Sequence, residues 1–218
     1  MPSENHAQAL QVLSYVDLTS LNNDDDKATI ESLCAKVTIG SQSVAAICVF
    51  PEWVATAQAY FEKHDLSIPI ATVTNFPDGC VNVERASRET RAAVAAGADE
   101  VDVVFPYKAL IGGDADAGRA LVTACREACG DRLLKVILET GELEEPALIR
   151  QAADIALACG ADFLKTSTGK VPVNATLEAA EILLTAIRDS GRDVGFKAAG
   201  GIRSAEDAKA YLDLAAGI

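Results

Sequence analysis

The sequence predicts an α/β fold, namely a (β/α)8 TIM barrel of which seven βα units are visible. Short apolar runs that are typical of buried strands alternate with helical patterns through all 218 residues. The centres of these runs fall about every 25 to 33 residues, which is the size of one βα unit. No Pro/Ser-rich linker divides the chain, so we expect one domain over residues 1–218. A GxGxxG motif, which would favour a dinucleotide-binding sheet, does not follow the first run.

The individual elements carry local signals of their type. An extra helix over about Glu4–Leu13 precedes the first strand. Proline suits a first helical turn, so Pro51 predicts a helix start after the second strand. Asn174 and Ser204 suit the N-caps of the last two helices, and Asp207 completes a capping-box pattern with Ser204. The predicted strands are Tyr15–Thr19, Val44–Phe50, Ile70–Thr74, Glu100–Phe105, Leu133–Glu139, Phe163–Thr166 and Val194–Ala198.

The series of units stops one short of a closed barrel. A helical pattern follows the seventh strand and runs to Gly217 and Ile218. On the established spacing an eighth strand would begin almost at once. We therefore expect a barrel that lacks its eighth strand and helix and has two open strand edges.

The amino-acid composition limits which molecules the protein is expected to bind and in which cellular compartment we expect it. The net charge of −13 and the isoelectric point near 4.5 argue against nucleic acid and anionic membranes. The six cysteines form no CxxC pair, so we expect reduced, buried thiols in a cytoplasmic protein. With only two histidines, we expect no metal cluster. The first residues lack a signal-peptide pattern, and no apolar run reaches the length of a membrane span.

Charged side chains are expected to converge inside the barrel. Side chains alternate along a strand, so an inward Lys165 places Leu164 against the helices. The same alternation turns Lys197 inward on the next strand, and it places Thr19 on the same face as Asp17. The carboxyl ends of barrel strands are where catalytic residues lie. Three lysines and two aspartates share this interior: Asp17, Asp102, Lys135, Lys165 and Lys197.

Lys165 is the candidate nucleophile of this cluster. A lysine of ordinary pKa is a free amine in only about one molecule in 2,500 at pH 7. The cation of Lys197 and partial desolvation would together lower the pKa of Lys165 by roughly 3 units. Asp102 is then the proton carrier, directly or through a water molecule. This combination predicts Schiff-base chemistry on a carbonyl compound, and two histidines are too few for a metal-assisted aldolase.

Other interpretations of the same residues remain open. A lysine at a strand end often extends its amine to water while its aliphatic stem stays buried. Asp102 and Asp17 would also serve as simple ion-pair partners of Lys135 and Lys197.

Two loops that follow adjacent strands have the composition of a phosphate site. Thr166–Lys170 offers hydroxyl groups, including that of Thr168, together with a glycine and a terminal lysine. Ala198–Arg203 offers a glycine pair, a helix N-terminus and a guanidinium. Either loop alone would suit an ordinary turn, and the two together indicate an anionic ligand.

These segments together resemble the deoxyribose-phosphate aldolase family, whose members are class I, metal-independent aldolases on a (β/α)8 barrel. The resemblance is in family order and covers nearly the whole chain. The matching stretches are residues 16–19, 45–48, 71–77, 98–107, 134–137, 139–141, 163–170 and 195–203.

The resemblance implies reversible cleavage of 2-deoxy-D-ribose 5-phosphate to D-glyceraldehyde 3-phosphate and acetaldehyde. It implies Lys165 as the Schiff-base lysine, Asp102 as the proton donor and acceptor, and Lys197 as the second lysine, which perturbs Lys165. It implies no cofactor, small phosphosugar and aldehyde substrates, and a homodimer as a common assembly. The implied phosphate residues are Gly169, Lys170, Gly200, Gly201 and Arg203, and the supporting polar residues are Asp17, Thr19, Lys135 and Thr168.

The expected open barrel leaves two alternatives to the aldolase. One is a non-catalytic fragment or binding protein that keeps the charged cluster but lacks a complete pocket. The other is a phosphosugar barrel with a different lysine-based activity, in which Lys165 is a base or an anion ligand.

Overall fold

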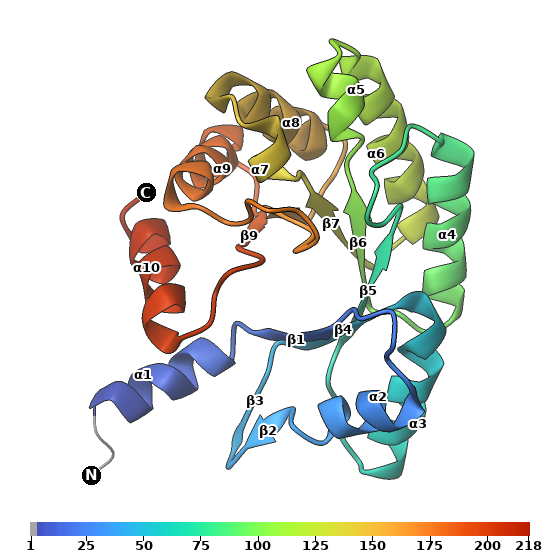
Figure 1. The fold of residues 1–218 in the computed structure, drawn as a ribbon, viewed down its shortest axis with the longest axis vertical. Helices are drawn as coiled ribbons and strands as arrows, with labels where there is room; N and C mark the ends of the chain where they lie inside the picture. Colours follow the sequence, from blue (N-terminus) through green and yellow to red (C-terminus); the bar gives the residue numbers. More distant parts are fainter. Residues whose placement is uncertain (1–3) are drawn as a thin grey trace.

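The centre of the structure is a curled parallel sheet whose strands follow the order of the chain (Figure 1). The structure is a computed structural model and describes residues 4–218, with side chains from residue 9 onward. Within these residues the sheet has seven strands, all parallel, as the sequence predicts. They are β1 (Asp17–Ser20), β4 (Ala46–Val49), β5 (Ile70–Thr74), β6 (Glu100–Val104), β7 (Leu133–Ile137), β8 (Phe163–Lys165) and β9 (Gly195–Lys197).

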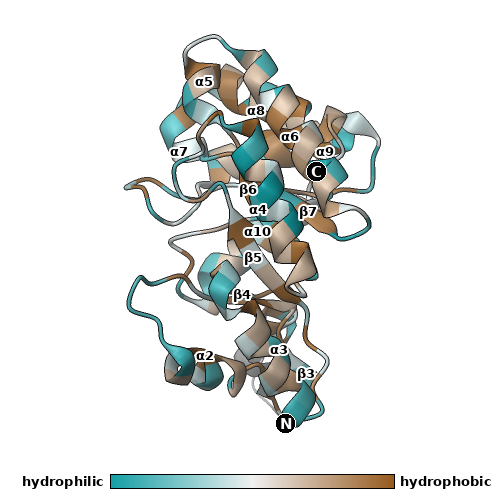
Figure 2. Cartoon of the chain, turned by 90° about the vertical axis from the view of Figure 1, so that its right-hand side faces the viewer, coloured by the Kyte–Doolittle hydropathy of each residue, from teal (hydrophilic) through white to brown (hydrophobic). Residues whose placement is uncertain are grey.

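Helices cover the outer, convex side of this sheet (Figure 1). In Figure 2 these helices carry both hydrophilic and hydrophobic residues, as expected when one face of each helix packs on the sheet. None of the described helices is both long and apolar enough to span a membrane. The helices are α1 (Glu4–Leu13), α2 (Lys27–Cys34), α3 (Val54–Lys63), α4 (Val83–Ala95), α5 (Tyr107–Ile111), α6 (Ala115–Cys129), α7 (Thr140–Leu143), α8 (Pro146–Ala158), α9 (Leu177–Ser190) and α10 (Ala205–Ala216).

Short elements that the sequence did not predict interrupt the regular alternation. A hairpin of β2 (Thr38–Ile39) and β3 (Gln42–Ser43) precedes β4, and the short helices α5 and α7 follow β6 and β7. Pro51 opens a turn of 3-10 helix over Pro51–Trp53, directly before α3. Helical turns of four or five residues lack room for a recognisable hydrophobic period, which explains why the sequence pattern did not reveal them.

One of the two predicted helix caps is correct and the other is wrong. Ser204 caps α10, and its hydroxyl and the Asp207 carboxylate form the predicted capping box. Asn174 does not cap α9. The cap is Thr176, whose hydroxyl accepts a hydrogen bond from the amide of Ala179. The Asn174 side chain instead donates to the carbonyl of Val171 at 3.0 Å, within the loop that follows β8.

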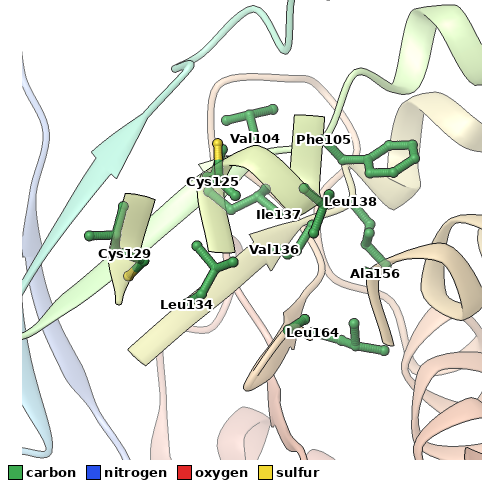
Figure 3. Close-up of a cluster of buried hydrophobic side chains, with 14 of the residues drawn as sticks. Val104, Phe105, Cys125, Cys129, Leu134, Val136, Ile137, Leu138, Ala156 and Leu164 are labelled. Atoms are coloured by element: carbon green, nitrogen blue, oxygen red, sulfur yellow. The ribbon is translucent and has the colours of Figure 1, made fainter. Parts of the chain in front are cut away.

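The main hydrophobic core lies between the sheet and the helices. Val101 and Val103 of β6 and Leu164 of β8 are fully buried in it, so these strand faces point outward to the helices, as alternation predicts. Figure 3 shows this packing, with Leu134 and Val136 of β7 close to side chains of α6 and α8. Their neighbours in the strands therefore point to the inner side of the curled sheet.

The inner side of the sheet has one apolar wall and one charged wall. A small cluster of Cys48, Ala71 and Val73 lines it at β4 and β5, together with Leu21 after β1. The charged residues come from β1 and from β6 to β9. The apolar wall lowers the local dielectric around these charges and strengthens their interactions with each other.

The two end strands of the sheet are less covered than its centre. In the described residues, β1 and β9 each pair with one neighbouring strand and not with each other. Every residue of β5 and β6 is buried, whereas all three residues of β9 are only half-buried. Helix α10, which follows β9, has no fully buried residue. The charged wall thus reaches the open side of the sheet at β9 and β1.

Candidate active site

Asp102 is the central residue of the charged wall. It lies in the middle of β6, and both of its carboxylate oxygens are bound by lysines from neighbouring strands. Lys165 at the end of β8 donates to Oδ2 at 2.6 Å, and Lys135 of β7 donates to Oδ1 at 2.9 Å. Asp102 is wholly buried and Lys165 is 7% exposed, so water contributes little to either charge. The interpretation of Asp102 as an ion-pair partner of Lys135 is therefore confirmed, and the pairing extends to Lys165.

These contacts keep Asp102 ionised. Burial opposes the ionisation of a carboxyl group, but Lys135 and Lys165 outweigh burial and lower the pKa of Asp102 to about 2. A carboxylate held between two ammonium groups is a stable resting state. It can become a proton acceptor once one of those positive charges is removed.

The pKa of Lys165 differs from the value expected from its sequence context. Burial favours the neutral amine, yet the adjacent Asp102 carboxylate outweighs burial and raises the pKa of Lys165 above its ordinary value. The expectation of a pKa lowered through Lys197 is therefore wrong for this resting state. The physical reason is that a carboxylate at 2.6 Å interacts more strongly with the ammonium than the lysine on the adjacent strand does.

Lys197 carries the lowered pKa instead. Its ammonium lies 3.0 Å from Asp17 and 3.5 Å from the carbonyl oxygen of Tyr15. Burial lowers the pKa of Lys197, and the Asp17 carboxylate offsets this only in part. Lys197 and Lys165 occupy paired positions on β9 and β8, so both lysines belong to one site. Asp17 is also the ion-pair partner of Lys197 that the sequence left as an alternative.

Glu100 is a member of the cluster that the sequence interpretation missed. Its carboxylate contacts the ammonium of Lys135, which also lies 3.5 Å from Asp17. Burial lowers the pKa of Lys135, but Asp102, Asp17 and Glu100 together outweigh burial and raise it. Glu100 lies two residues before Asp102 on the same strand, so the alternation rule already placed it on the inner face. With Glu100, three carboxylates balance three lysines, which reduces the cost of burying them.

A second carboxylate that was not assigned a role, Glu139, holds the loop after β8. Its side chain is buried and accepts hydrogen bonds from the amide of Thr168 at 3.0 Å and from the Thr168 hydroxyl at 2.6 Å. The Thr168 hydroxyl in turn accepts a hydrogen bond from the amide of Lys170 at 3.0 Å. Thr168 thus belongs to the polar network around the predicted phosphate loop.

The two predicted phosphate loops lie against each other. The Thr166 hydroxyl accepts a hydrogen bond from the Ala199 amide at 3.0 Å and so joins the loop after β8 to the loop after β9. A Cβ atom at Gly200 would lie 2.7 Å from the Asn174 side chain, so only glycine allows this approach. Within residues 4–218, no hydrogen bond involves the amides of Gly169, Gly200 or Gly201. These amides are free to bind an anion.

The remaining predicted residues lie at the rim of this site. The Lys170 ammonium donates to the carbonyl oxygen of Leu21 at 2.6 Å, across the inner side of the sheet. Arg203 is exposed, and its amide is held by Asp207. Thr19 is also exposed, and its hydroxyl donates to the carbonyl of Asp17 at 2.9 Å. Cys48 lies in the apolar wall, where burial raises its pKa to about 12, so it packs as a neutral thiol.

Surface depressions elsewhere are a weaker basis for a site. One of about 320 Å³ lies between α8 and α9. Its Arg150 is already paired with Asp154 at 2.9 Å and with Asp189 at 3.0 Å, so its charges satisfy one another. The interior cluster instead combines a buried lysine–carboxylate pair with two neighbouring loops whose glycine amides lack a hydrogen-bond partner in the described residues.

Comparison with known proteins extends these observations over the whole chain. The sequence profile of the DeoC/LacD family aldolases matches residues 11–217. A structure from Coccidioides immitis, provisionally named a deoxyribose-phosphate aldolase, is similar with a TM-score of 0.89 and 28% identity, over 94% of this chain and 79% of that chain. An aldolase designated QR15 is similar with a TM-score of 0.83 and 29% identity, over 93% and 87% of the two chains.

A more distant structure supports the fold alone. The deoxyribose phosphate aldolase from Aeropyrum pernix, described as a tetramer, has a TM-score of 0.80 and 22% identity, over 98% of this chain and 91% of that chain.

Proposed function

The chain belongs to the DeoC/LacD family of aldolases, and on this premise we propose that it cleaves 2-deoxy-D-ribose 5-phosphate reversibly to D-glyceraldehyde 3-phosphate and acetaldehyde. The observation that carries the proposal is the buried pair of Lys165 and Asp102, at 2.6 Å, beside two loops with free backbone amides. The reaction uses only side chains and water.

In the proposed first stage, Lys165 forms an imine with the substrate aldehyde. Asp102 takes a proton from the ammonium, and the free amine attacks the aldehyde carbon. Asp102 then gives this proton to the hydroxyl group of the carbinolamine, which leaves as water, and a protonated imine remains. In the resting pair the Lys165 ammonium donates a hydrogen bond to Asp102 at 2.6 Å, so the proton passes to a group in direct contact.

In the second stage the carbon–carbon bond breaks. The hydroxyl on the third substrate carbon gives up its proton, the bond between the second and third carbons breaks, and its electron pair neutralises the protonated imine. Glyceraldehyde 3-phosphate leaves, and an enamine of acetaldehyde remains on Lys165. Protonation of the enamine carbon and hydrolysis of the imine then release acetaldehyde and restore the amine.

The charge balance around Asp102 explains how one carboxylate can serve both directions. The pKa of Asp102 is lowered to about 2 because Lys135 and Lys165 outweigh its burial. When the protonated imine becomes a neutral enamine, one of these two charges disappears and the pKa of Asp102 rises. Asp102 then holds the proton until the enamine carbon takes it back, directly or through a water molecule. Lys197 and Asp17 complete the polar surroundings of the reacting carbons.

The phosphate group of the substrate is assigned to the loops after β8 and β9. The free amides of Gly169, Gly200 and Gly201 and the side chains of Lys170 and Arg203 supply hydrogen bonds and positive charge there. The site is locally basic although the whole chain carries a net charge of −13.

The six cysteines are all free thiols, which supports a cytoplasmic location in this proposal.

Trapping of the imine tests the proposal. The purified protein is incubated with acetaldehyde and borohydride, and its peptides are mapped by mass spectrometry. The expected result is one reduced ethyl adduct, on Lys165, together with release of glyceraldehyde 3-phosphate from 2-deoxyribose 5-phosphate in a coupled assay. Lys165→Met should lose both signals.

A matched control uses Lys27, which is exposed on α2 and paired with Glu31. Lys27→Met should retain the adduct and the turnover. Folded wild-type protein that forms no adduct, or a Lys165→Met variant that forms as much as wild type, would contradict the proposed function.

A further inference from the structure

Glu139 adopts a backbone conformation that is costly for its residue type. It follows β7 and has φ 56° and ψ 56°. These angles lie in the left-handed region, which residues other than glycine, asparagine and aspartate rarely adopt. Its side chain is fully buried, and burial raises the pKa of its carboxyl group despite the hydrogen bonds from Thr168. Strain and desolvation at one residue persist only where the surrounding contacts compensate them.

The compensating contacts all lead to one turn. Glu139 Oε1 accepts from the amide of Thr168 at 3.0 Å, and Oε2 accepts from its hydroxyl at 2.6 Å. The same hydroxyl oxygen accepts from the amide of Lys170 at 3.0 Å. The Thr168 hydroxyl thus donates one hydrogen bond, to Glu139, and accepts another, from the Lys170 amide. Three hydrogen bonds therefore fix the residues on both sides of Gly169.

Gly169 lies between the two residues that these hydrogen bonds fix. It has φ +80°, and the space where a Cβ atom would lie is open. Its amide has no hydrogen-bond partner among residues 4–218. The two flanking residues hold the direction of this amide and the starting point of the Lys170 side chain. Without Glu139, the turn would lose two of its three fixed contacts.

We propose that Glu139 is a positioning residue that sets the affinity of the site for the substrate phosphate by fixing the turn over residues 168–170. The inference rests on the proposed function and deepens it. Glu139 touches neither the phosphate nor the reacting carbons and acts through Thr168. A residue with a merely structural role would affect phosphorylated and unphosphorylated substrates alike.

The experiment compares kcat and KM for 2-deoxyribose 5-phosphate and for unphosphorylated 2-deoxyribose. Glu139→Gly removes the carboxylate while glycine adopts the left-handed conformation without strain. Loss of the two hydrogen bonds to Thr168 should weaken the binding of the phosphorylated substrate about tenfold, so its KM should rise about tenfold. The value of kcat, and both parameters for 2-deoxyribose, should change by less than about twofold. Glu139→Gln, which keeps an acceptor for the Thr168 amide, should restore part of the affinity.

The chain offers a closely matched control in Glu144. It has the same residue type and the same φ of 56° at the other end of α7, but its side chain is exposed. Glu144→Gly should leave every parameter unchanged. Thr168→Val should reproduce the defect of Glu139→Gly, and the double variant should add little to either.

Binding of inorganic phosphate, measured by calorimetry, separates this inference from the proposed function. Weaker phosphate binding by Glu139→Gly than by wild type supports the inference even if wild type turns over neither sugar, a result that would refute the proposed function alone. Equal phosphate binding by the two proteins would overturn the inference. Equal losses on both sugars would overturn it as well.

Discussion

The ammonium of Lys165 lies 2.6 Å from the carboxylate of Asp102, in a region that is almost wholly buried. The two residues are 63 positions apart in the chain and meet from β8 and β6 across β7. The resting site therefore holds an ion pair rather than a free amine. In the proposed reaction, the acceptor for the proton of Lys165 is thus in direct contact with it.

Replacement of Asp102 by asparagine should lower the pKa of Lys165. Burial already favours the neutral amine, and in wild type the Asp102 carboxylate outweighs it, so loss of that carboxylate lets burial prevail. The rate of borohydride-trapped imine formation should reach its plateau at a pH lower by more than about one unit than in wild type. Turnover should nevertheless fall about 100-fold or more, because the variant lacks the proposed proton carrier. A plateau at an unchanged or higher pH would show that Asp102 does not set the charge of Lys165.

Replacement of Lys197 by methionine should act in the opposite direction and more weakly. Lys197 and Lys165 are like charges on paired positions of β9 and β8, so removal of one stabilises the charge of the other. The pKa of Lys165 should rise, and imine trapping at neutral pH should slow. The pH dependence of borohydride-trapped imine formation measures this pKa. Lys209→Met, on the exposed face of α10, is the control. Faster trapping than in wild type would refute this assignment of charges.

Asp102 should also contribute to the loss of stability in acid. Its pKa in the folded chain is about 2, against 3.8 for an unperturbed aspartate, so its ionised form stabilises the fold fully above about pH 5. This contribution is about 2 kcal/mol; about half of it is lost by pH 3, between the two pKa values, and the rest as the pH falls through the folded pKa. Urea unfolding at pH 6 and pH 3 should show a loss about 1 kcal/mol larger for wild type than for Asp102→Asn. Asp116→Asn, at a 98% exposed side chain, should show the wild-type loss. Equal losses in wild type and Asp102→Asn would be inconsistent with a depressed pKa.

Substitution of Gly141 by alanine should destabilise the fold. A Cβ atom there would lie 2.0 Å from the carbonyl oxygen of Val173, so the loop between β8 and α9 must shift. We expect a loss of about 1 to 3 kcal/mol in the free energy of unfolding. Gly217→Ala, where the nearest atom is 3.5 Å away, provides the comparison and should change stability by less than about 0.5 kcal/mol. If Gly141→Ala were as stable as wild type, the close approach of this loop to α7 would be wrong.

Much of the fold and of the charged cluster follows from local sequence patterns. Strand alternation alone placed Asp102, Lys135 and Lys165 on one inner face, and the structure confirms that these side chains meet. The same rule applied two residues earlier would have found Glu100. Ser204 was a reliable cap because its partner Asp207 lies within the same helical turn.

The sequence does not show which neighbouring group lies nearest to a side chain, so properties such as its pKa could not be derived from the sequence. Alternation gives a side chain its face but not its distance to a charge on another strand. The pKa of Lys165 therefore took the wrong direction when Lys197 was taken as its main neighbour. The cap predicted at Asn174 was wrong for a similar reason. Asn174 and Thr176 are both suitable caps, and in the structure the Asn174 side chain binds the carbonyl of Val171 in its own loop instead.

The contact of Lys197 with the carbonyl of Tyr15 joins positions 182 residues apart. Contacts of such sequence separation form late in folding, because the chain between them must first be ordered. During synthesis, Asp17 leaves the ribosome before both of its lysine partners, and Lys197 of β9 follows long after Lys135 of β7. The last charges of the cluster are thus neutralised only when the two end strands come together. Assembly of the charged cluster is thereby delayed until nearly the whole described chain has folded.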